Sequence, residues 1–134
     1  MRDRIYITKI DAGRIGRLVA ALRAGNALPI ENLERLEQEL DRAEVVDEEA
    51  IPPSVVTLNA EVHLEDLDSG ERMHYRLVLP NQSRSEIDIS ILAPVGTAIL
   101  GYRTGEVVEW PVPKGMRRLK IHDVLHPQTS LATR

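Results

Sequence analysis

The chain has 134 residues, 43% of them hydrophobic, and a formal net charge of −4 from 17 Lys and Arg against 21 Asp and Glu. This length fits one domain, or one domain with an appendage. The absence of cysteine excludes disulfides, thiolate nucleophiles and Cys-ligated zinc, and the acidic balance argues against non-specific binding to nucleic acid, which requires cations to neutralise phosphate.

The first third of the chain predicts a short strand and then a short antiparallel helical hairpin. Ile5–Thr8 is the expected strand, and Asp11 is the expected N-cap of a helix that ends at Gly25-Asn26. Its apolar face repeats at helical spacing through Ile15, Leu18, Val19 and Leu22. Pro29 fits the first turn of a second helix, with an apolar stripe of Ile30, Leu33, Leu36, Leu40 and Ala43. Arms of about 12 residues project roughly 18 Å, and a hairpin this short needs support from the rest of the chain.

The charged and Pro-rich stretch at 46–53 predicts a boundary, with the hairpin domain at 1–46 and a second domain at 47–134. Beyond it the hydrophobic period changes from 3.6 to 2, which is typical of strands. We expect a turn at Asp68-Ser69-Gly70, a polar loop at Pro80–Ser85 and a short helix at Pro94–Gly101. The expected strands are Ser54–Leu58, Glu61–Glu65, Glu71–Leu79, Ile87–Leu92, Val107–Pro111 and Met116–Leu125. The order predicts an α+β fold in which a helix covers a mostly antiparallel sheet.

Several charged residues allow two readings. Glu31 and Glu34 form either an acidic patch near the hairpin tip or a solvated helix face. His122 and His126 would be spaced for a metal on a helix, but in a strand residues i and i+4 lie about 13 Å apart, so no metal is expected. A basic group in the C-terminal half either contacts an acidic partner or a phosphate, or is a solvated strand face: Arg103, Lys114, Arg117, Arg118 and Lys120.

From about Ala43 to Leu125 the chain resembles the C-terminal domain of the Gre transcript-cleavage factors. The matching pieces are Val62–Leu67 with its Asp68-Ser69-Gly70 turn, Ile89–Gly96, and Gly101–Val108. Nearly the whole chain is similar to the shorter, Rnk-like branch of the GreA/GreB family, through Leu28–Ile30, Glu39–Ala43, Val55–Asn59 and Ala93–Gly101. The resemblance implies an FKBP-like antiparallel sheet with one short helix, and RNA polymerase as the partner.

Gre factors insert a long coiled coil into the secondary channel of RNA polymerase, where acidic tip residues help to hold a second Mg²⁺. This chain departs from that pattern, because its hairpin is far shorter and its tip, Gly25–Asn32, lacks an Asp followed three residues later by Glu. The candidate tip residues are Asn26, Glu31 and Glu34. The Gre loop that docks on the polymerase corresponds to Leu92, Ala93 and Pro94, of which only Pro94 keeps the Gre residue, so docking by apolar packing is expected.

The resemblance therefore implies a regulator that occupies the secondary channel, competes with Gre-type factors and does not stimulate cleavage. The alternatives are a true cleavage factor, and a general adaptor whose effect on nucleoside diphosphate kinase levels is direct or indirect. Prolyl isomerase activity is disfavoured, since the chain has no Phe and one Trp to line such a pocket. We expect no catalytic residue, no cofactor and no membrane contact, because no apolar run approaches the roughly 20 residues of a span. The resemblance also implies the DNA binding attributed to the family, and we expect no sequence-specific contact with nucleic acid. The expected location is the cytoplasm.

Overall fold

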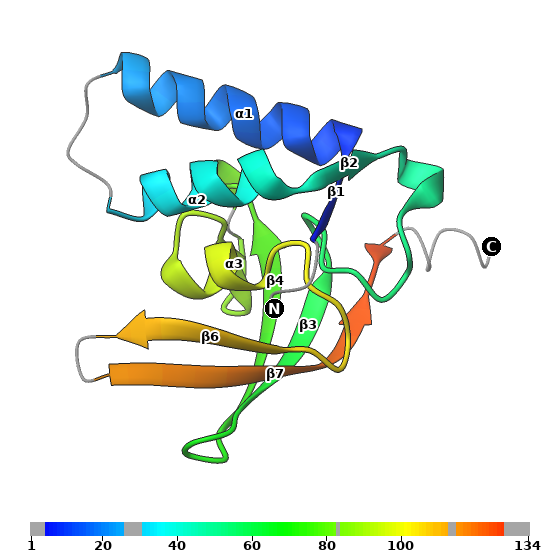
Figure 1. Cartoon of the computed structure of the whole chain (residues 1–134), viewed down its shortest axis with the longest axis vertical. Helices are drawn as coiled ribbons and strands as arrows, with labels where there is room; N and C mark the ends of the chain where they lie inside the picture. The colour runs from blue at the N-terminus through cyan, green and yellow to red at the C-terminus, as the bar shows by residue number, and fades with distance from the viewer. Residues whose placement is uncertain (1–4, 26–30, 83, 113–114, 128–134) are drawn as a thin grey trace.

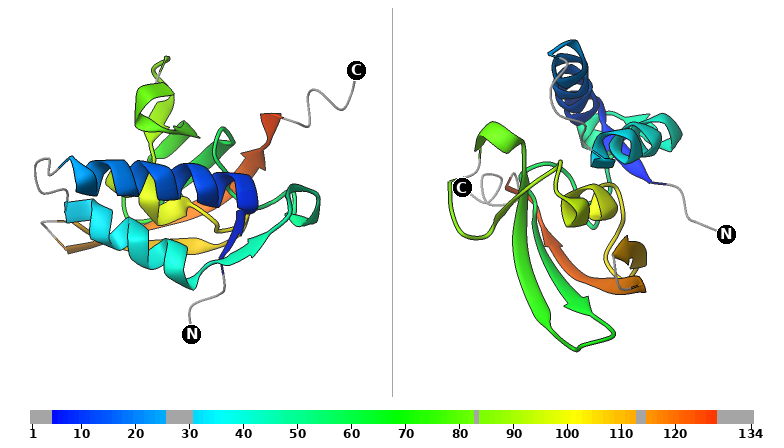
Figure 2. Two further views of the ribbon diagram at one scale, coloured as in Figure 1. Left: turned by 90° about the horizontal axis from the view of Figure 1, so that it is seen from above. Right: turned by 90° about the vertical axis from the view of Figure 1, so that its left-hand side faces the viewer.

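The structure is a computed structural model that describes residues 5–25, 31–82, 84–112 and 115–127. The expected tip residue Asn26, with Pro29 and Ile30, lies outside these residues, as does Lys114. The described part has an N-terminal helical hairpin, a curved sheet, and a short helix between them on the concave side of the sheet (Figures 1 and 2). The predicted α+β class, with an N-terminal hairpin followed by a sheet and one short helix, is confirmed.

The hairpin consists of α1 (Lys9–Ala24) and α2 (Glu31–Arg42). The predicted N-cap was wrong by three residues: α1 is capped by Thr8, whose Oγ1 accepts the backbone N–H of Asp11 at 3.1 Å. Asp11 is instead buried within the first turn. The predicted apolar stripes do face the core, since Ile15, Leu33 and Leu36 are buried.

A small parallel pair of strands, β1 (Tyr6–Thr8) and β2 (Glu44–Val46), joins the two ends of the hairpin. The sequence predicted β1 but not β2. The pair is tied to the sheet domain by the backbone N–H of Tyr6, which donates to the carbonyl of Gly101 at 3.3 Å. Gly101 adopts a φ of 84°, and a Cβ there would lie 2.8 Å from Cβ of Ile5, so the close approach requires glycine.

The sheet of the described residues has five strands in the order β5-β4-β3-β7-β6. Its members are β3 (Glu61–Asp66), β4 (Arg72–Val78), β5 (Asp88–Ser90), β6 (Val107–Val112) and β7 (Gly115–Leu125). The expectation of an antiparallel sheet holds for four strands, but β5 runs parallel to β4, so the sheet is mixed. The chain between β4 and β5, including the 3₁₀ turn η2 (Pro80–Gln82), returns to the same end of the sheet before β5 begins.

The predicted strand at Ser54–Leu58 was wrong. This segment, which follows a second 3₁₀ turn, η1 (Glu48–Ala50), contains one isolated bridge between Val55 and Arg103. Val55 and Val56 are consecutive and both fully buried. The backbone N–H of Val55 donates to the nearby carbonyl of Pro52, and that of Val56 donates to the carbonyl of Tyr102. The segment therefore forms no ladder with a neighbouring strand of the described residues and crosses the core as irregular structure.

One hydrophobic core extends through both parts of the chain. It includes Ile15 and Leu36 from the hairpin, Val62 and Ile121 from the sheet, and Ile99 from α3 (Pro94–Ile99). A hydrogen bond also links the C-terminal end of α2 to the rest of the protein: Nη2 of Arg42 donates to the hydroxyl of Tyr102 at 2.6 Å. Within the described ranges, no helix is both long enough and apolar enough to cross a membrane.

Candidate functional site

The candidate docking loop, Leu92–Pro94, connects β5 to α3 and is held by backbone contacts around Ser90. The Ser90 hydroxyl accepts the N–H of Leu92 at 2.9 Å, and the Ser90 carbonyl accepts the N–H of Ala93 at 2.9 Å. Pro94 opens the helix, where its fixed φ is suitable and its missing N–H is not needed. The loop therefore has a defined conformation, set by Ser90 at the end of β5 and by its own proline.

The three loop residues differ in exposure. Pro94 is exposed, Ala93 is half-buried, and Leu92 is half-buried with its side chain packed against the core. Ala93 is also the N-cap residue of α3 and provides no side-chain cap. The surface that this loop offers to a partner is thus small and mainly apolar, and Leu92 contributes to folding as well.

Carboxylates near the described end of the hairpin face an arginine. Glu37 binds Arg23 across the hairpin, with Nε of Arg23 3.1 Å from Oε2 of Glu37. The pKa of Arg23 is raised, first by this hydrogen bond and then by the charges of Glu37 and Glu34. Glu34 is exposed on α2, and Glu31 is the first residue of that helix. Arg23 therefore offsets the charge of Glu37, while the Glu34 carboxylate stays on the exposed face of α2.

The hairpin end and the start of α3 lie on the same side of the molecule. In Figure 1 the C-terminal end of α1, the N-terminal end of α2 and the N-terminal end of α3 all point to the left. Helices α2 and α3 are in contact, and Leu36 of α2 is completely buried in the shared core. The structure thus brings the docking loop and the described end of the hairpin to one side.

The histidines are engaged in local contacts. His63 and His74 stack across β3 and β4 with ring centroids 4.3 Å apart, and His122 lies 2.7 Å from Oε1 of Glu65. His126 lies 2.6 Å from the carbonyl oxygen of Val55. In the described part of the chain, no group of three or more His, Asp or Glu side chains is arranged to hold a metal.

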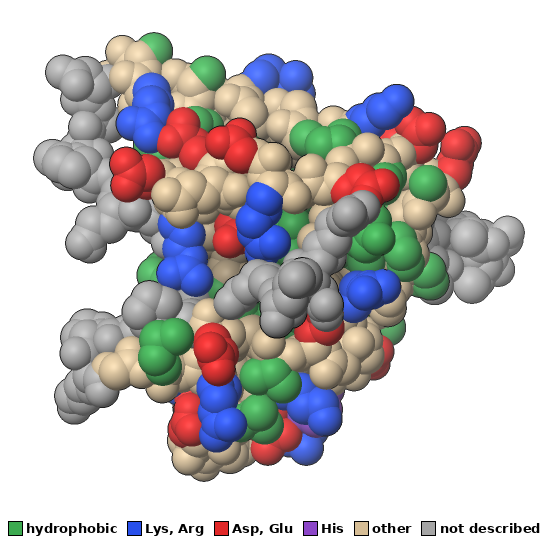
Figure 3. Space-filling model, in the orientation of Figure 1, with side chains coloured by type: hydrophobic (Ala, Val, Ile, Leu, Met, Phe, Trp, Pro, Cys, Tyr) green, Lys and Arg blue, Asp and Glu red, His purple; other side chains and the backbone are tan. Residues whose placement is uncertain are grey.

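The basic residues that the sequence left open are mostly paired within the protein. Arg117 binds Asp66 through its Nε at 2.6 Å, Arg118 binds Asp68 at 3.0 Å, and Arg103 lies over the ring of Tyr6. Acidic and basic side chains alternate over the face shown in Figure 3. For these residues the structure favours the solvated strand face over a binding patch.

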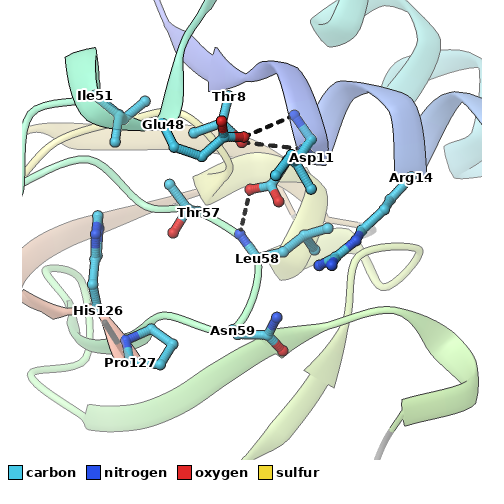
Figure 4. A pocket seen from close by; sticks show the side chains of 11 residues that line it. Thr8, Asp11, Arg14, Glu48, Ile51, Thr57, Leu58, Asn59, His126 and Pro127 are labelled. Carbon is cyan, nitrogen blue, oxygen red and sulfur yellow. Dashed lines mark hydrogen bonds between the residues drawn. The ribbon is translucent and has the colours of Figure 1, made fainter. Parts of the chain in front are cut away.

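Sequence reasoning missed a polar pocket of about 150 Å³ beneath the N-terminal end of α1 (Figure 4). Asp11 lies at its inner wall, where Oδ2 accepts the backbone N–H of Leu58 at 3.0 Å. Burial raises the pKa of Asp11, and the hydrogen bond from Leu58 and the charge of Arg14 oppose this increase. The pocket joins residues 47 positions apart, so no local sequence signal could have revealed it.

Two families match this chain in succession. Residues 3–46 match the Rnk N-terminus, and residues 51–126 match the C-terminal part of the transcription elongation factors GreA/GreB. The regulator of nucleoside diphosphate kinase from Escherichia coli K12 is 39% identical over 116 residues, which cover 86% of this chain and 83% of that protein. GreA from Clostridium botulinum Eklund 17B is 36% identical over 91 residues, or 67% of this chain and 57% of GreA. Among solved structures, a prokaryotic transcription elongation factor GreA/GreB from Nitrosomonas europaea is 40% identical, with a TM-score of 0.73, covering 93% of this chain and all of that one.

Proposed function

The chain belongs to the GreA/GreB family of transcription factors, with an Rnk-type N-terminal part, and on this basis we propose that it binds RNA polymerase at the entrance of the secondary channel without stimulating RNA cleavage. The resemblance predicted from the sequence is confirmed at the level of the family. A cytoplasmic location follows from the proposed partner. Any effect on nucleoside diphosphate kinase, to which the name of the Escherichia coli relative refers, would then be indirect, through transcription.

The hairpin is the observation that carries this proposal. Its arms, α1 and α2, have 16 and 12 residues, so the helices extend only about 24 Å and about 18 Å. A Gre coiled coil is much longer and must reach the polymerase active site. Catalytic Mg²⁺ also needs carboxylate oxygens that are free to coordinate it, whereas Glu37, near the described end of the hairpin, is bound to Arg23. Reach and chemistry both favour binding without cleavage.

The docking loop supports the binding part of this proposal. Leu92–Pro94 lies on the side of the molecule to which the hairpin end points, so a single partner can contact both (Figure 1). Because exposed Pro94 and half-buried Ala93 are apolar, the contact gains affinity from removing water and not from pairing charges.

Transcript cleavage in backtracked polymerase complexes tests this proposal. We expect no cleavage above the intrinsic rate, and a dose-dependent loss of Gre-stimulated cleavage when this protein is added. Cleavage well above the intrinsic rate that disappears in a Glu31→Ala, Glu34→Ala double variant would instead establish the alternative, a Gre-type cleavage factor.

A matched pair of substitutions tests the docking loop. Ala93→Arg places a long cation in the proposed contact, whereas Ala50→Arg makes the same change at an exposed position of η1. Ala93→Arg should weaken binding to core polymerase about tenfold, equivalent to about 1.4 kcal/mol, and Ala50→Arg should leave it unchanged. Equal affinities of the two variants would place the contact elsewhere.

A further inference from the structure

A second pocket, of about 370 Å³, lies between α1 and the β4–β5 edge of the sheet. Three arginines line it, each from a different element: Arg14 from α1, Arg76 from β4, and Arg84 from the chain before β5. The amide side chains of Asn59 and Gln82 and the carboxylate of Asp88 complete its polar lining. Arg14 and Asn59 also line the smaller pocket, and Figure 4 shows the Arg14 side chain extending from α1 toward Asn59.

Asp88 fixes two of the three arginine-bearing segments. Its side chain is only 2% exposed, and its Oδ1 lies 3.0 Å from Nη1 of Arg76. Its Oδ2 accepts the backbone N–H groups of Arg84 at 2.7 Å and Ser85 at 3.1 Å. One buried carboxylate therefore orients the Arg76 guanidinium and holds the backbone that carries Arg84.

Asn59, which lines another part of the pocket, is also held in a defined conformation. Asn59 adopts a φ of 73°, in the left-handed region that Asn tolerates better than most residues. Its backbone N–H donates to the carbonyl of Leu77 at 2.6 Å. The pocket is therefore bounded by two segments held by hydrogen bonds to the same strand region.

The charges of the lining do not cancel. Three guanidinium groups face one carboxylate, in a protein whose formal net charge is −4. Arg76 is paired with Asp88, and its Nη2 lies 3.5 Å from Oε2 of Glu61. The side chains of Arg14 and Arg84 form no ion pair at contact distance with any of the described residues, although the charge of Arg14 also acts on the buried carboxylate of Asp11, which does not line this pocket. An anion in this pocket would supply the missing partner.

We infer that this pocket binds a small anion with a phosphoryl group, contacted by Arg14 and Arg84 and supported by Arg76. Guanidinium groups match phosphoryl oxygens in geometry and charge. The three guanidinium groups come from three different elements and can therefore contact several oxygens of a tetrahedral phosphoryl group. A planar carboxylate needs only one guanidinium group to bind both of its oxygens. None of the lining residues belongs to the hairpin tip or to Leu92–Pro94, so the inference does not depend on polymerase binding.

Titration of the full-length protein with inorganic phosphate and with pyrophosphate, followed by NMR of backbone and arginine side-chain N–H groups at constant ionic strength, tests this inference. We expect saturable shifts at residues of the pocket, larger than those produced by acetate, because a planar carboxylate cannot meet three guanidinium groups at once. Arg14→Gln and Arg84→Gln should each weaken binding about tenfold, the usual effect of losing one charged hydrogen-bond partner.

Arg72→Gln is the matched control. Arg72 lies on the same strand as Arg76, its side chain is 71% exposed, and it does not line the pocket. Its removal changes the net charge equally and should alter binding by less than roughly twofold. The inference is overturned if no phosphate titration saturates, if acetate binds as well as phosphate, or if Arg72→Gln weakens binding as much as Arg84→Gln. Unchanged unfolding midpoints would show that the variants are folded.

Discussion

Gly96 lies within α3, where an added Cβ would stand 2.2 Å from the carbonyl oxygen of Ser90 and 3.0 Å from Cδ1 of Leu77. The Ser90 carbonyl also accepts the N–H of Ala93, so moving it would disturb the docking loop. Gly96→Ala should lower the free energy of unfolding by about 1–3 kcal/mol, measured by urea denaturation.

Gly16 provides the control for this substitution. It lies in α1, and a Cβ there would meet nothing within 4 Å. Gly16→Ala should therefore stabilise the protein by up to about 1 kcal/mol, because alanine favours the helix. Equal effects of the two substitutions would show that α3 shifts easily and that the loop is not fixed by close packing.

Asp66 should make the stability depend on pH through Arg117. Its side chain is 1% exposed and accepts the N–H groups of Asp68 and Ser69 as well as the Arg117 guanidinium. The hydrogen bond from Arg117 is the main cause of its lowered pKa. The pKa of Asp66 in the folded state lies below its unfolded value of about 4. The stabilisation that ionised Asp66 provides is therefore fully present above a pH of about 4, and it is lost as the pH falls through the folded-state pKa.

Carboxyl ¹³C NMR titration measures this effect directly. Arg117→Gln should move the pKa of Asp66 up toward its ordinary value and flatten the acid side of the stability curve. Arg118→Gln is the control, since Arg118 pairs with Asp68 and not with Asp66. An unchanged pKa of Asp66 in Arg117→Gln would mean that the backbone N–H groups alone hold the carboxylate ionised.

At the level of elements, the parts of the fold that the sequence predicted correctly are those set by neighbours in the chain. The stripes through Ile15 and Leu36 and the alternation in Glu61–Glu65 are local periodicities, and both gave the right element. Two features depend on partners elsewhere in the chain: the parallel direction of β5 beside β4, and the bridge between Val55 and Arg103. A local sequence pattern cannot predict either of them.

The candidate sites divide in the same way. The position of Leu92–Pro94 between a strand and a short helix could be predicted because a strand end, a proline and small residues follow one another in sequence, whereas its role as a docking loop was implied by the resemblance to the Gre factors and stays a prediction. The arginine-lined pocket could not, because Arg14 and Arg84 are 70 positions apart. Asp11 looked like a helix cap because an acidic residue near a helix start often caps it, but Thr8 provides the cap and the carboxylate of Asp11 accepts the N–H of Leu58, far along the chain.

Leu36 tests how strongly the hairpin depends on the sheet domain. It is completely buried where α2 meets the core shared with α3. Leu36→Ala should cost about 2–5 kcal/mol of unfolding free energy, from lost apolar burial and the cavity left behind. Val45→Ala, at a 47% exposed position of β2, should cost far less. Similar losses from both would mean that α2 does not pack tightly on the core.

For the molecule as a whole, the shared core predicts one cooperative unfolding transition. The sequence suggested a boundary near 46, yet Ile7, Ile15 and Leu36 before it pack in one cluster with Val62 and Ile121 after it. Separating the two parts would expose apolar side chains on both surfaces, at about 25 cal/mol for each Å². The hairpin should therefore not unfold before the sheet.

Two spectroscopic probes can follow the two parts separately. Circular dichroism at 222 nm is dominated by α1 and α2, whereas the chain's one tryptophan, Trp110, lies on β6. In urea both signals should change with the same midpoint and the same dependence on denaturant, as a two-state transition requires. Leu36→Ala should lower both midpoints together, because a change in α2 is transmitted to β6 through the common core. If the helical signal were lost at lower urea than the tryptophan signal, the hairpin would be a separate unit, and the depth to which it enters a partner would be adjustable without affecting the docking domain.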